Sequence, residues 1–458
     1  MADALVLDDP ARFADWERQL STADACTRPI RLRGRITAVD LTSGETATAY
    51  DTDAEPGHVL HVACGNRRET ACPSCSAVYK RDARQLVRSG LVGGKGVPES
   101  VAEHPCVFAT FTAPGFGPVH ARRERNGKIL PCRPRRDAAK RVCPHGRDIS
   151  CPHRHPADDP RLGRPMCPGC YDYESAVVFN ATAGDLWRRF TTYLPRCLAA
   201  MMGVTQKDLR SLVRLRFVKV AEYQARGVVH FHAIIRLDAN TRDDDTYAPP
   251  PPAWSADVLA AAIQAAASSA TVTADIGDTG RALLVRFGAQ TDTKVVRSAT
   301  ADALSRNAVA NYIAKYATKS AADAPGLPAY RLHTAAEVDA LRCPPHYRRL
   351  IETAWALGYT QWAHCLGYGG HFLTKSRRFS VTFGHLRTAR KQHRRAQRPD
   401  AELDPWGRQI DETTVLFIAE WQYAGFGYQA SDVHALALMS ADNARGTNMP
   451  SLKKFLNH

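Results

Sequence analysis

Two neighbouring strands are predicted in residues 214–237, where hydrophobic and β-branched positions dominate. The segment reads RLRFVKVAEYQARGVVHFHAIIRL, and an Ala-Arg-Gly stretch interrupts its apolar pattern near the middle. Such an interruption between two β-branched runs indicates a tight turn that joins antiparallel strands. A further strand is predicted in CVFATFTAPGFGPVH, residues 106–120, because its aromatic and β-branched run stops at Pro and Gly.

Helical patterns flank these strands. Residues 175–210 and 302–320 are predicted helices, and the Ala-rich residues 255–270 predict a third, with Ser255 as its N-cap. Residues 281–296 are typical of a strand or a hairpin. The pattern therefore alternates helices and strands through the middle of the chain.

Two histidines, His230 and His232, lie one residue apart within the second of the paired strands. Residues i and i+2 of a strand point to the same side, so both imidazoles project together while Phe231 points to the opposite, buried side. Two neutral imidazoles that converge supply half of the ligands of a divalent metal site. The alternative is a strand whose histidines are satisfied by ordinary hydrogen bonds.

A third ligand depends on the register of the turn. A three-residue turn over 225–227 sets Glu222 opposite His230, whereas a two-residue Arg-Gly turn sets Tyr223 there and turns Glu222 away. The sequence leaves both registers open. Two histidines with one carboxylate or amide, and with positions left for other ligands, suit Mg²⁺ or Mn²⁺ held between protein and phosphate.

A second motif, NYIAKYATK, follows about 80 residues further on. Residues four apart share one face of a helix, so Tyr312 and Tyr316 form one pair, and Lys315 and Lys319 form another along the adjoining flank. Lysines and a divalent metal favour the phenolate of a tyrosine and polarise a phosphodiester, so a tyrosine there is suited to attack phosphorus. The alternative is an amphipathic helix with solvated lysines and tyrosines packed at its edge.

The two motifs together resemble the HUH endonucleases, and most closely the two-tyrosine rolling-circle initiators. The strand FATFTAPGFG, residues 108–117, is similar to the first motif of that family, and the three motifs occur in the family's order. Over most of residues 60–390, the segments CGNRRETACPSCSAVY, FTAPGFGPVH and LTKSRRFSVTFG are similar to replication initiators of actinomycete plasmids and integrative conjugative elements.

The resemblance implies an α+β fold, with a ferredoxin-like HUH nuclease core in which the histidine strand lies centrally in an antiparallel sheet. It implies Tyr316 as the first nucleophile and Tyr312 as the second, although which acts first stays open. It also implies Glu222 as the third ligand of Mg²⁺ or Mn²⁺. Lys315 and Lys319 would stabilise charge at the phosphate.

Thirteen cysteines add a second kind of metal chemistry. Two C-x-x-C pairs and a polar, Pro-rich segment with little apolar periodicity predict one or two structural zinc ions that staple the N-terminal and inserted segments. His145, His153 or His155 could replace one thiolate of the second site, and Cys106 or Cys132 could replace Cys26 in the first. The expected ligands are Cys64, Cys72, Cys75 and Cys26 for the first site, and Cys143, Cys151, Cys167 and Cys170 for the second.

The net charge of +15 favours a polyanionic partner, and nucleic acid is the leading one, although a GC-rich genome would also raise the arginine content. The basic run 385–398 suits either a DNA grip or a solvated helix face. The expected partners are origin DNA, single-stranded or as supercoiled or cruciform duplex, and a host helicase and polymerase, because no Walker A motif is present. Candidate DNA contacts are Arg122, Arg123, Arg226, Arg377 and Arg378.

No run approaches the length of apolar residues that a membrane span needs, and the N-terminus lacks a signal-peptide pattern, so a cytoplasmic protein is expected. The length of 458 residues suggests several domains. The expected division is a zinc-binding region at 1–105, the first strand motif at 106–120, a zinc-binding insertion at 121–172, the nuclease core at 173–325, and an accessory, DNA-binding region at 326–458.

The sequence thus predicts a replication initiator that nicks and joins single-stranded DNA through a 5′-phosphotyrosine at a rolling-circle origin. A conjugative relaxase on the same core is the nearest alternative. A zinc-dependent DNA-binding regulator without catalysis would explain the charge and the cysteines, but not the ordered histidine and tyrosine motifs. A zinc hydrolase that uses water would yield a free 5′-phosphate and no protein–DNA bond.

Overall fold

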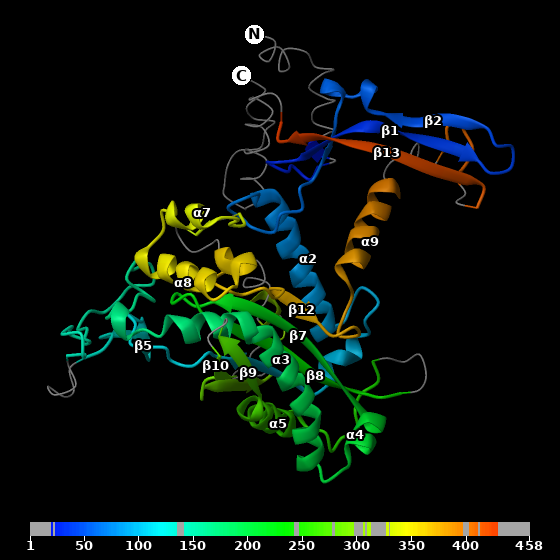
Figure 1. Cartoon of the computed structure of the whole chain (residues 1–458). Coiled ribbons are helices and arrows are strands. Elements are labelled where there is room, and N and C mark those ends of the chain that lie inside the picture. The colour runs from blue at the N-terminus through cyan, green and yellow to red at the C-terminus, as the bar shows by residue number, and fades with distance from the viewer. Residues whose placement is uncertain are drawn as a thin grey trace. The chain divides into compact units, whose positions relative to one another are not determined.

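The computed structural model shows two compact units, residues 84–381 and residues 1–83 with 382–458 (Figure 1). It describes residues 20–21, 23–134, 142–241, 247–276, 280–296, 306, 309–312, 327–328, 330–396, 403–410 and 413–428.

A five-stranded antiparallel sheet is the centre of the 84–381 unit, and its strand order is β11-β4-β8-β7-β12. The strand with the paired histidines, β8, therefore lies in the middle, between β4 and β7 (Figure 1). The two predicted strands of residues 214–237 are confirmed as β7 and β8. The bounds are β4 Cys106–Phe111, β7 Val213–Tyr223, β8 Val229–Ala239, β11 Thr291–Val295 and β12 Leu373–Lys375.

One face of this sheet packs on α3 (Tyr173–Met201), a long helix that begins at the N-cap Asp172. Trp187 of α3 lies edge-on to Phe111 of β4 and to Phe231 of β8, with ring centroids 5.5 and 5.8 Å away. Phe231 is buried there. Because neighbours in a strand alternate faces, His230 and His232 lie on the side of the sheet away from α3.

Further elements surround the sheet. The predicted cap of the Ala-rich helix is confirmed, since the Ser255 side chain accepts from the backbone N–H of Val258 at the start of α5. Residues 281–296 form two strands that pair with different partners, β10 with β9 and β11 with β4, and not a hairpin. The bounds are α4 Gln206–Leu212, α5 Ala256–Ser269, α7 Ala335–Asp339, α8 Pro345–Ala356, β5 Arg123–Arg125, β6 Lys128–Leu130, β9 Thr271–Ile276 and β10 Arg281–Arg286.

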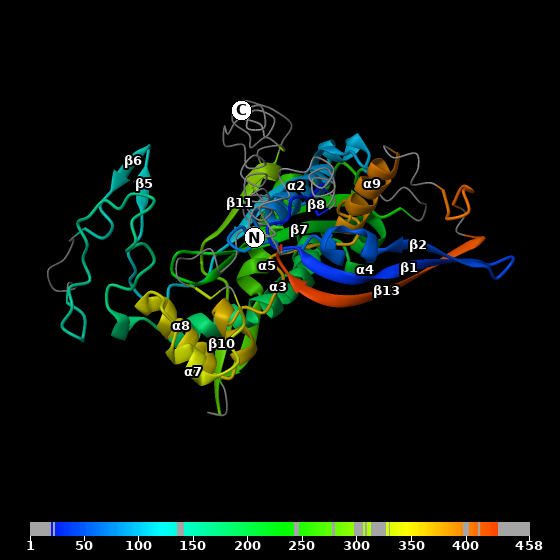
Figure 2. The same cartoon turned by 90° about the horizontal axis from the view of Figure 1, so that it is seen from above.

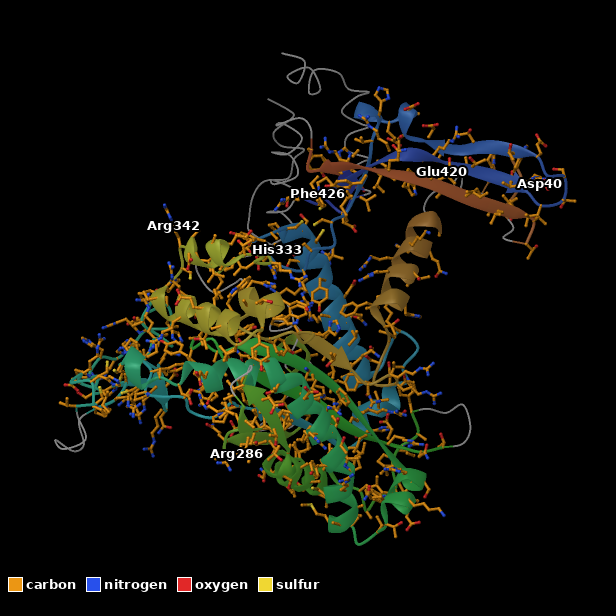
Figure 3. The ribbon with its side chains drawn as sticks, viewed as in Figure 1. Asp40, Arg286, His333, Arg342, Glu420 and Phe426 are labelled. Atoms are coloured by element: carbon orange, nitrogen blue, oxygen red, sulfur yellow. The ribbon has the colours of Figure 1, made fainter. Side chains whose placement is uncertain are left out.

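The other unit joins the two ends of the chain in one four-stranded antiparallel sheet. β13 (Val415–Phe426) pairs with β1 (Ile30–Asp40) along its whole length, and β2 and β3 pair with β1. Figure 3 labels Asp40 and Phe426 at opposite ends of this ladder. The other bounds are β2 Thr46–Asp51, β3 Leu60–Val62 and α9 Phe383–Ala396, and α2, Pro73–Val92, has residues in both units.

The basic run predicted at 385–398 lies mostly on α9. The Arg390 guanidinium donates to the Asp82 carboxylate at 2.9 Å, and Tyr79 stacks on Phe383 with ring centroids 5.2 Å apart.

The described residues also contain short 3-10 helices at Thr52–Ala54, Pro56–His58, Glu99–Glu103, Pro168–Cys170 and Thr360–Cys365. Within the described residues, no helix is both long and apolar enough to cross a membrane.

A lysine lies in the core on the α3 side of the five-stranded sheet. Lys219 of β7 is 4% exposed, and its ammonium lies 4.2 Å from the ring centroid of Phe231 and 5.7 Å from that of Trp187. Burial lowers the pKa of this ammonium to about 7, well below the ordinary value for lysine. The folded state therefore disfavours the charged form, and below pH 7 the full cost of burying the charge opposes folding.

We expect Lys219→Met to stabilise the protein by about 3–5 kcal/mol at pH 6 to 7. The advantage should shrink between pH 7 and 10, because the native lysine loses its proton in that range and the unfolded lysine does not. Urea unfolding followed by circular dichroism over this pH range measures it. Lys294→Met, at an exposed position on β11, is the control. An equal gain at every pH would contradict the assigned cause.

Candidate functional site

The β7–β8 hairpin sets the register on which the site depends. Glu222 pairs with His230, and Tyr223 pairs with Val229. The turn is the three-residue form, since the Gln224 N–H donates to the Val228 carbonyl at 3.0 Å. Gly227 has a φ of +75°, and a Cβ there would lie 2.5 Å from Leu350, so the turn requires glycine.

Glu222, His230 and His232 form one cluster of potential metal ligands. The Glu222 Oε2 atom lies 3.0 Å from His230 Nε2 and 3.3 Å from His232 Nε2. The side chains are 11, 14 and 3% exposed, so little water competes at the centre of the cluster. Two imidazoles and a carboxylate are a fitting donor set for a divalent cation, and they leave further coordination positions for water or substrate oxygens.

A threonine on the neighbouring strand orients His232. Thr110 of β4 is directly opposite His232, and its Oγ1 lies 3.1 Å from His232 Nδ1. When the Nδ1–H donates to this hydroxyl oxygen, the Nε2 lone pair faces Glu222 and is ready for a cation. Phe108, also on β4, stacks on the His232 ring with centroids 5.8 Å apart. Sequence reasoning missed Thr110, whose signal is its place two residues after Phe108 in the first motif.

Tyr312 lies against the same histidine. Its ring centroid is 5.2 Å from that of His232 and 5.6 Å from that of Phe108, in both cases nearly edge-on. Its side chain is 40% exposed, so one part of the ring packs on the site and another part reaches solvent. Tyr316, Lys315 and Lys319 lie outside the described residues.

A buried arginine, Arg306, lies six residues before Tyr312 and hydrogen-bonds to backbone at the edge of the sheet. Arg306 donates to the carbonyls of Leu91, His104 and Val296 at 3.3, 3.3 and 3.4 Å. Val296 directly follows β11, so the contact joins the tyrosine segment to the strand sequence that precedes it. Arg306 is 7% exposed, and sequence reasoning did not single it out.

The same face of β8 continues into a buried ion network. Arg236 donates to both carboxylate oxygens of Asp238 at 2.7 and 2.8 Å, and His104 Nδ1 lies 2.8 Å from Asp238 Oδ1. Burial alone would raise the pKa of Asp238, but the hydrogen bonds from His104 and Arg236 outweigh it and lower the pKa. The network ties the C-terminal end of β8, the strand that carries the two histidines, to His104.

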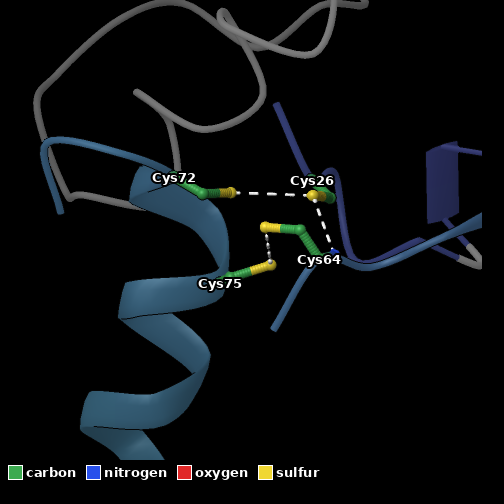
Figure 4. A group of neighbouring side chains, drawn as sticks. All are labelled: Cys26, Cys64, Cys72 and Cys75. Atoms are coloured by element: carbon green, nitrogen blue, oxygen red, sulfur yellow. Dashed lines mark hydrogen bonds between the residues drawn. The ribbon is translucent and has the colours of Figure 1, made fainter. Parts of the chain in front are cut away.

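The first predicted cysteine group is brought together as expected, with Cys26 as its fourth member (Figure 4). The Sγ atoms of Cys26 and Cys72 are 3.6 Å apart, and those of Cys64 and Cys75 are 3.7 Å apart. Thiolates at tetrahedral positions around zinc would lie about 3.8 Å apart, so the group fits a Cys₄ zinc site. The alternates Cys106 and Cys132 lie elsewhere.

The second predicted group is not brought together as expected. Cys143, Cys167 and Cys170 cluster with His145, whereas Cys151 belongs to a separate group with His120, Cys132 and His155. The reason lies in the backbone. Cys151 exchanges two hydrogen bonds with Arg133, at 2.8 and 2.7 Å, which places it beside Cys132, while the Cys143 N–H donates to Arg147 and closes a turn around His145. The described residues therefore hold three Cys/His groups where one or two structural zinc sites were predicted.

The candidate DNA-contacting arginines differ in their surroundings. Arg122, Arg123, Arg377 and Arg378 are exposed. Arg226 instead donates to the carbonyls of Pro114 and Ala113 at 2.7 and 3.0 Å and to the Gln224 side chain at 2.8 Å. These bonds hold the hairpin turn and make Arg226 a poor candidate for a DNA contact.

Fold and site thus define a mixed α/β protein with antiparallel sheets, a His–His–Glu cluster and three Cys/His groups that suit metal ions. The family model described as "Replication initiator protein, pSAM2" (RepSA) matches residues 12–442. A replication initiator protein of Streptomyces ambofaciens is 42% identical over 441 residues, which cover 93% of this chain and 90% of that protein. No solved structure matches the chain. The chain belongs to the pSAM2 family of replication initiator proteins.

We expect Thr110→Val to weaken Mn²⁺ binding about 10- to 100-fold, because His232 loses the partner that fixes its ring. His232→Ala should abolish this binding. Electron paramagnetic resonance titration of free Mn²⁺ against zinc-loaded protein measures both. Thr110→Ser keeps the hydroxyl and is the matched control, so equal affinities for the Val and Ser variants would contradict the role given to Thr110.

Proposed function

We propose that the chain is a metal-dependent strand transferase that nicks and rejoins single-stranded DNA at a rolling-circle replication origin through a 5′-phosphotyrosine. The observation that carries the proposal is the packing of Tyr312 on His232, whose Nε2 lies beside the Glu222 carboxylate. A tyrosine and a donor set that suits a divalent cation, about 80 residues apart in sequence, lie side by side. Family membership supports the replication role, and the local chemistry supports the mechanism.

His230, His232 and Glu222 would hold the Mg²⁺ or Mn²⁺ ion. When bound, such an ion would withdraw electron density from the non-bridging oxygens of the scissile phosphate and so favour attack on phosphorus. The residues' own task is to hold that position fixed. Thr110 orients His232, and the buried Arg236–Asp238 pair stiffens the strand that carries both imidazoles.

The nucleophile is a tyrosine hydroxyl, with Tyr316 first and Tyr312 second as the resemblance to two-tyrosine initiators implies. The phenol oxygen forms a bond to phosphorus as the bond from phosphorus to the 3′-oxygen breaks. The phenol proton is lost and the departing 3′-oxygen gains one, so the products are a 5′-phosphotyrosine and a free 3′-hydroxyl. No water is consumed, and the phosphodiester energy is kept for rejoining. Lys315 and Lys319 would stabilise the added charge at the phosphate.

The partners follow from this reaction. The substrate is origin DNA, presented as a single strand or extruded from supercoiled duplex, and the net charge of +15 supports binding of its phosphates. Strand separation and synthesis are then the work of a host helicase and polymerase. The exposed Arg122, Arg123, Arg377 and Arg378 are the side chains proposed to contact the backbone.

The test is incubation of the full-length protein and Mn²⁺ with labelled single strands that tile the region next to its gene. We expect a protein–DNA adduct that survives denaturing electrophoresis, and a DNA-linked peptide from residues 311–319 in mass spectrometry. Tyr312→Phe with Tyr316→Phe should remove the adduct. Tyr330→Phe, at a tyrosine that is 63% exposed, is the matched control and should leave it intact.

Each other outcome rejects the mechanism in a recognisable way. Cleavage that leaves a free 5′-phosphate and no adduct indicates a hydrolase that uses water. Binding without cleavage under every divalent cation indicates a zinc-dependent DNA-binding regulator. An adduct formed only with strands from a conjugative transfer origin keeps the chemistry but makes the protein a relaxase.

A further inference from the structure

Two Cys/His groups in residues 118–172 share their stretch of chain in an alternating order. One group is His120, Cys132, Cys151 and His155, and the other is Cys143, His145, Cys167 and Cys170. Along the chain, His120 and Cys132 of the first group are followed by Cys143 and His145 of the second. Then come Cys151 and His155 of the first group, and finally Cys167 and Cys170 of the second. Neither group can therefore be assembled without enclosing ligands of the other.

The His120 group has the dimensions of a zinc site. Cys151 Sγ lies 3.4 Å from His155 Nε2, and a thiolate and an imidazole at tetrahedral positions around zinc would lie about 3.6 Å apart. His155 Nδ1 lies 2.7 Å from the Asp159 carboxylate, which also accepts two hydrogen bonds from the Arg161 guanidinium and one from the Arg161 backbone N–H. A carboxylate behind the far nitrogen is the arrangement that orients a zinc-binding histidine.

The other histidine of this group, His120, gives a second, independent indication that the group binds an ion. His120 Nδ1 is buried and has no hydrogen-bond partner among the described residues. Leaving a buried ring nitrogen unpaired is costly, and coordination of an ion would remove that cost. The backbone already places the ring, since the His120 N–H donates to Arg164 and the His120 carbonyl accepts from Gly163, at 2.9 and 2.8 Å.

The Cys143 group is also closely assembled. His145 Nδ1 lies 3.2 Å from Cys170 Sγ. Gly169, next to that cysteine, allows the approach, because a Cβ there would lie 2.8 Å from His145 Nε2. Three sulfurs and one imidazole complete a common set of structural zinc ligands.

Residues 121–170 also lack a hydrophobic core that could hold this shape. Among the described residues of this segment, 121–134 and 142–170, every buried hydrophobic residue is a cysteine of one of the two groups: Cys132, Cys143, Cys151 and Cys167. The only regular elements before the 3-10 turn at Cys170 that the described part contains are the short strands β5 and β6 (Figure 2). A segment of this length without apolar burial requires metal ions to fold.

Residues 121–171 contact the β7–β8 turn, whose register places Glu222 opposite His230. Gly163 packs so closely on the Ala225 carbonyl that a Cβ there would lie 2.0 Å from its oxygen. Tyr171, directly after the last ligand, donates from its hydroxyl to the Arg226 carbonyl at 3.4 Å. Glu222 and His230 lie on the two strands that this turn joins.

We propose that residues 120–170 bind two zinc ions in two interleaved sites, His120–Cys132–Cys151–His155 and Cys143–His145–Cys167–Cys170, and that this two-ion module supports the β7–β8 turn. With the Cys26 group, the full chain then holds three zinc ions. The module is structural, because each ion has four protein ligands and no position for substrate.

Native mass spectrometry of the full-length protein, purified with zinc and without chelator, counts the ions. We expect three zinc ions per chain in the wild type, and a count of one or none overturns the proposal without any variant. Cys132→Ala and His120→Ala distinguish the interleaved grouping from a Cys143–Cys151–Cys167–Cys170 site. Each should lose zinc under the first grouping, and neither should do so under the second.

Two matched variants control for general damage. Cys197→Ala removes a half-buried cysteine outside all three groups, and His153→Ala removes the exposed histidine two residues before His155, so both should keep three ions. Support of the turn is read by hydrogen exchange. Amides of residues 222–230 should exchange faster in Cys132→Ala than in Cys197→Ala, and equal exchange would refute the supporting role. Neither readout involves DNA cleavage, so the outcome is independent of the proposed nicking activity.

Discussion

The contact of one glutamate with two imidazoles is the interaction on which the site depends. Glu222 Oε2 reaches the Nε2 atoms of both His230 and His232 because the hairpin register places Glu222 directly opposite the first histidine. A slip of one residue would turn Glu222 to the α3 side of the sheet and leave two histidines without a carboxylate. The turn that requires Gly227 is therefore as necessary for the His–His–Glu cluster as the three ligands themselves.

This contact is also where proton and cation compete. A carboxylate between two imidazoles is held by an Nε2–H when no cation is bound, whereas a cation requires the Nε2 lone pairs. If Thr110 accepts from Nδ1 of His232, the Nε2 atom of that ring is left with its lone pair for a cation, and the edge-on ring of Tyr312 lies beside the same imidazole. The buried arginines Arg236 and Arg306 add the rigidity that such a site needs, since they join β8, β11 and the tyrosine segment through several backbone carbonyls.

Local pattern was enough to predict much of this arrangement. Alternation placed His230 and His232 on one face and Phe231 on the other, and the turn residues limited the third ligand to two registers. Cys26 was the expected fourth ligand of the C-x7-C-x2-C group, with Cys106 and Cys132 as alternates, and it is the nearest cysteine before that run. The sequence pattern of neighbouring residues could not predict which backbone segments pair when they lie far apart along the chain. The β1–β13 ladder joins residues nearly 400 apart, and Cys151 follows a backbone pairing with Arg133 instead of its spacing from Cys143. The ferredoxin-like description of the core and the division of the chain into linear domains stay predictions.

Zinc and the site ion have different tasks in this account. Most ligands of the three Cys/His groups are buried, and zinc there would stabilise segments that have little apolar surface to bury, whereas the His–His–Glu cluster would keep positions for oxygen ligands. Anomalous diffraction at the manganese edge, from crystals of the zinc-loaded full-length protein grown with Mn²⁺, tests the central claim most directly. We expect a manganese peak within coordination distance of Glu222, His230 and His232. Manganese bound elsewhere, with Glu222 still hydrogen-bonded to both imidazoles, would contradict it.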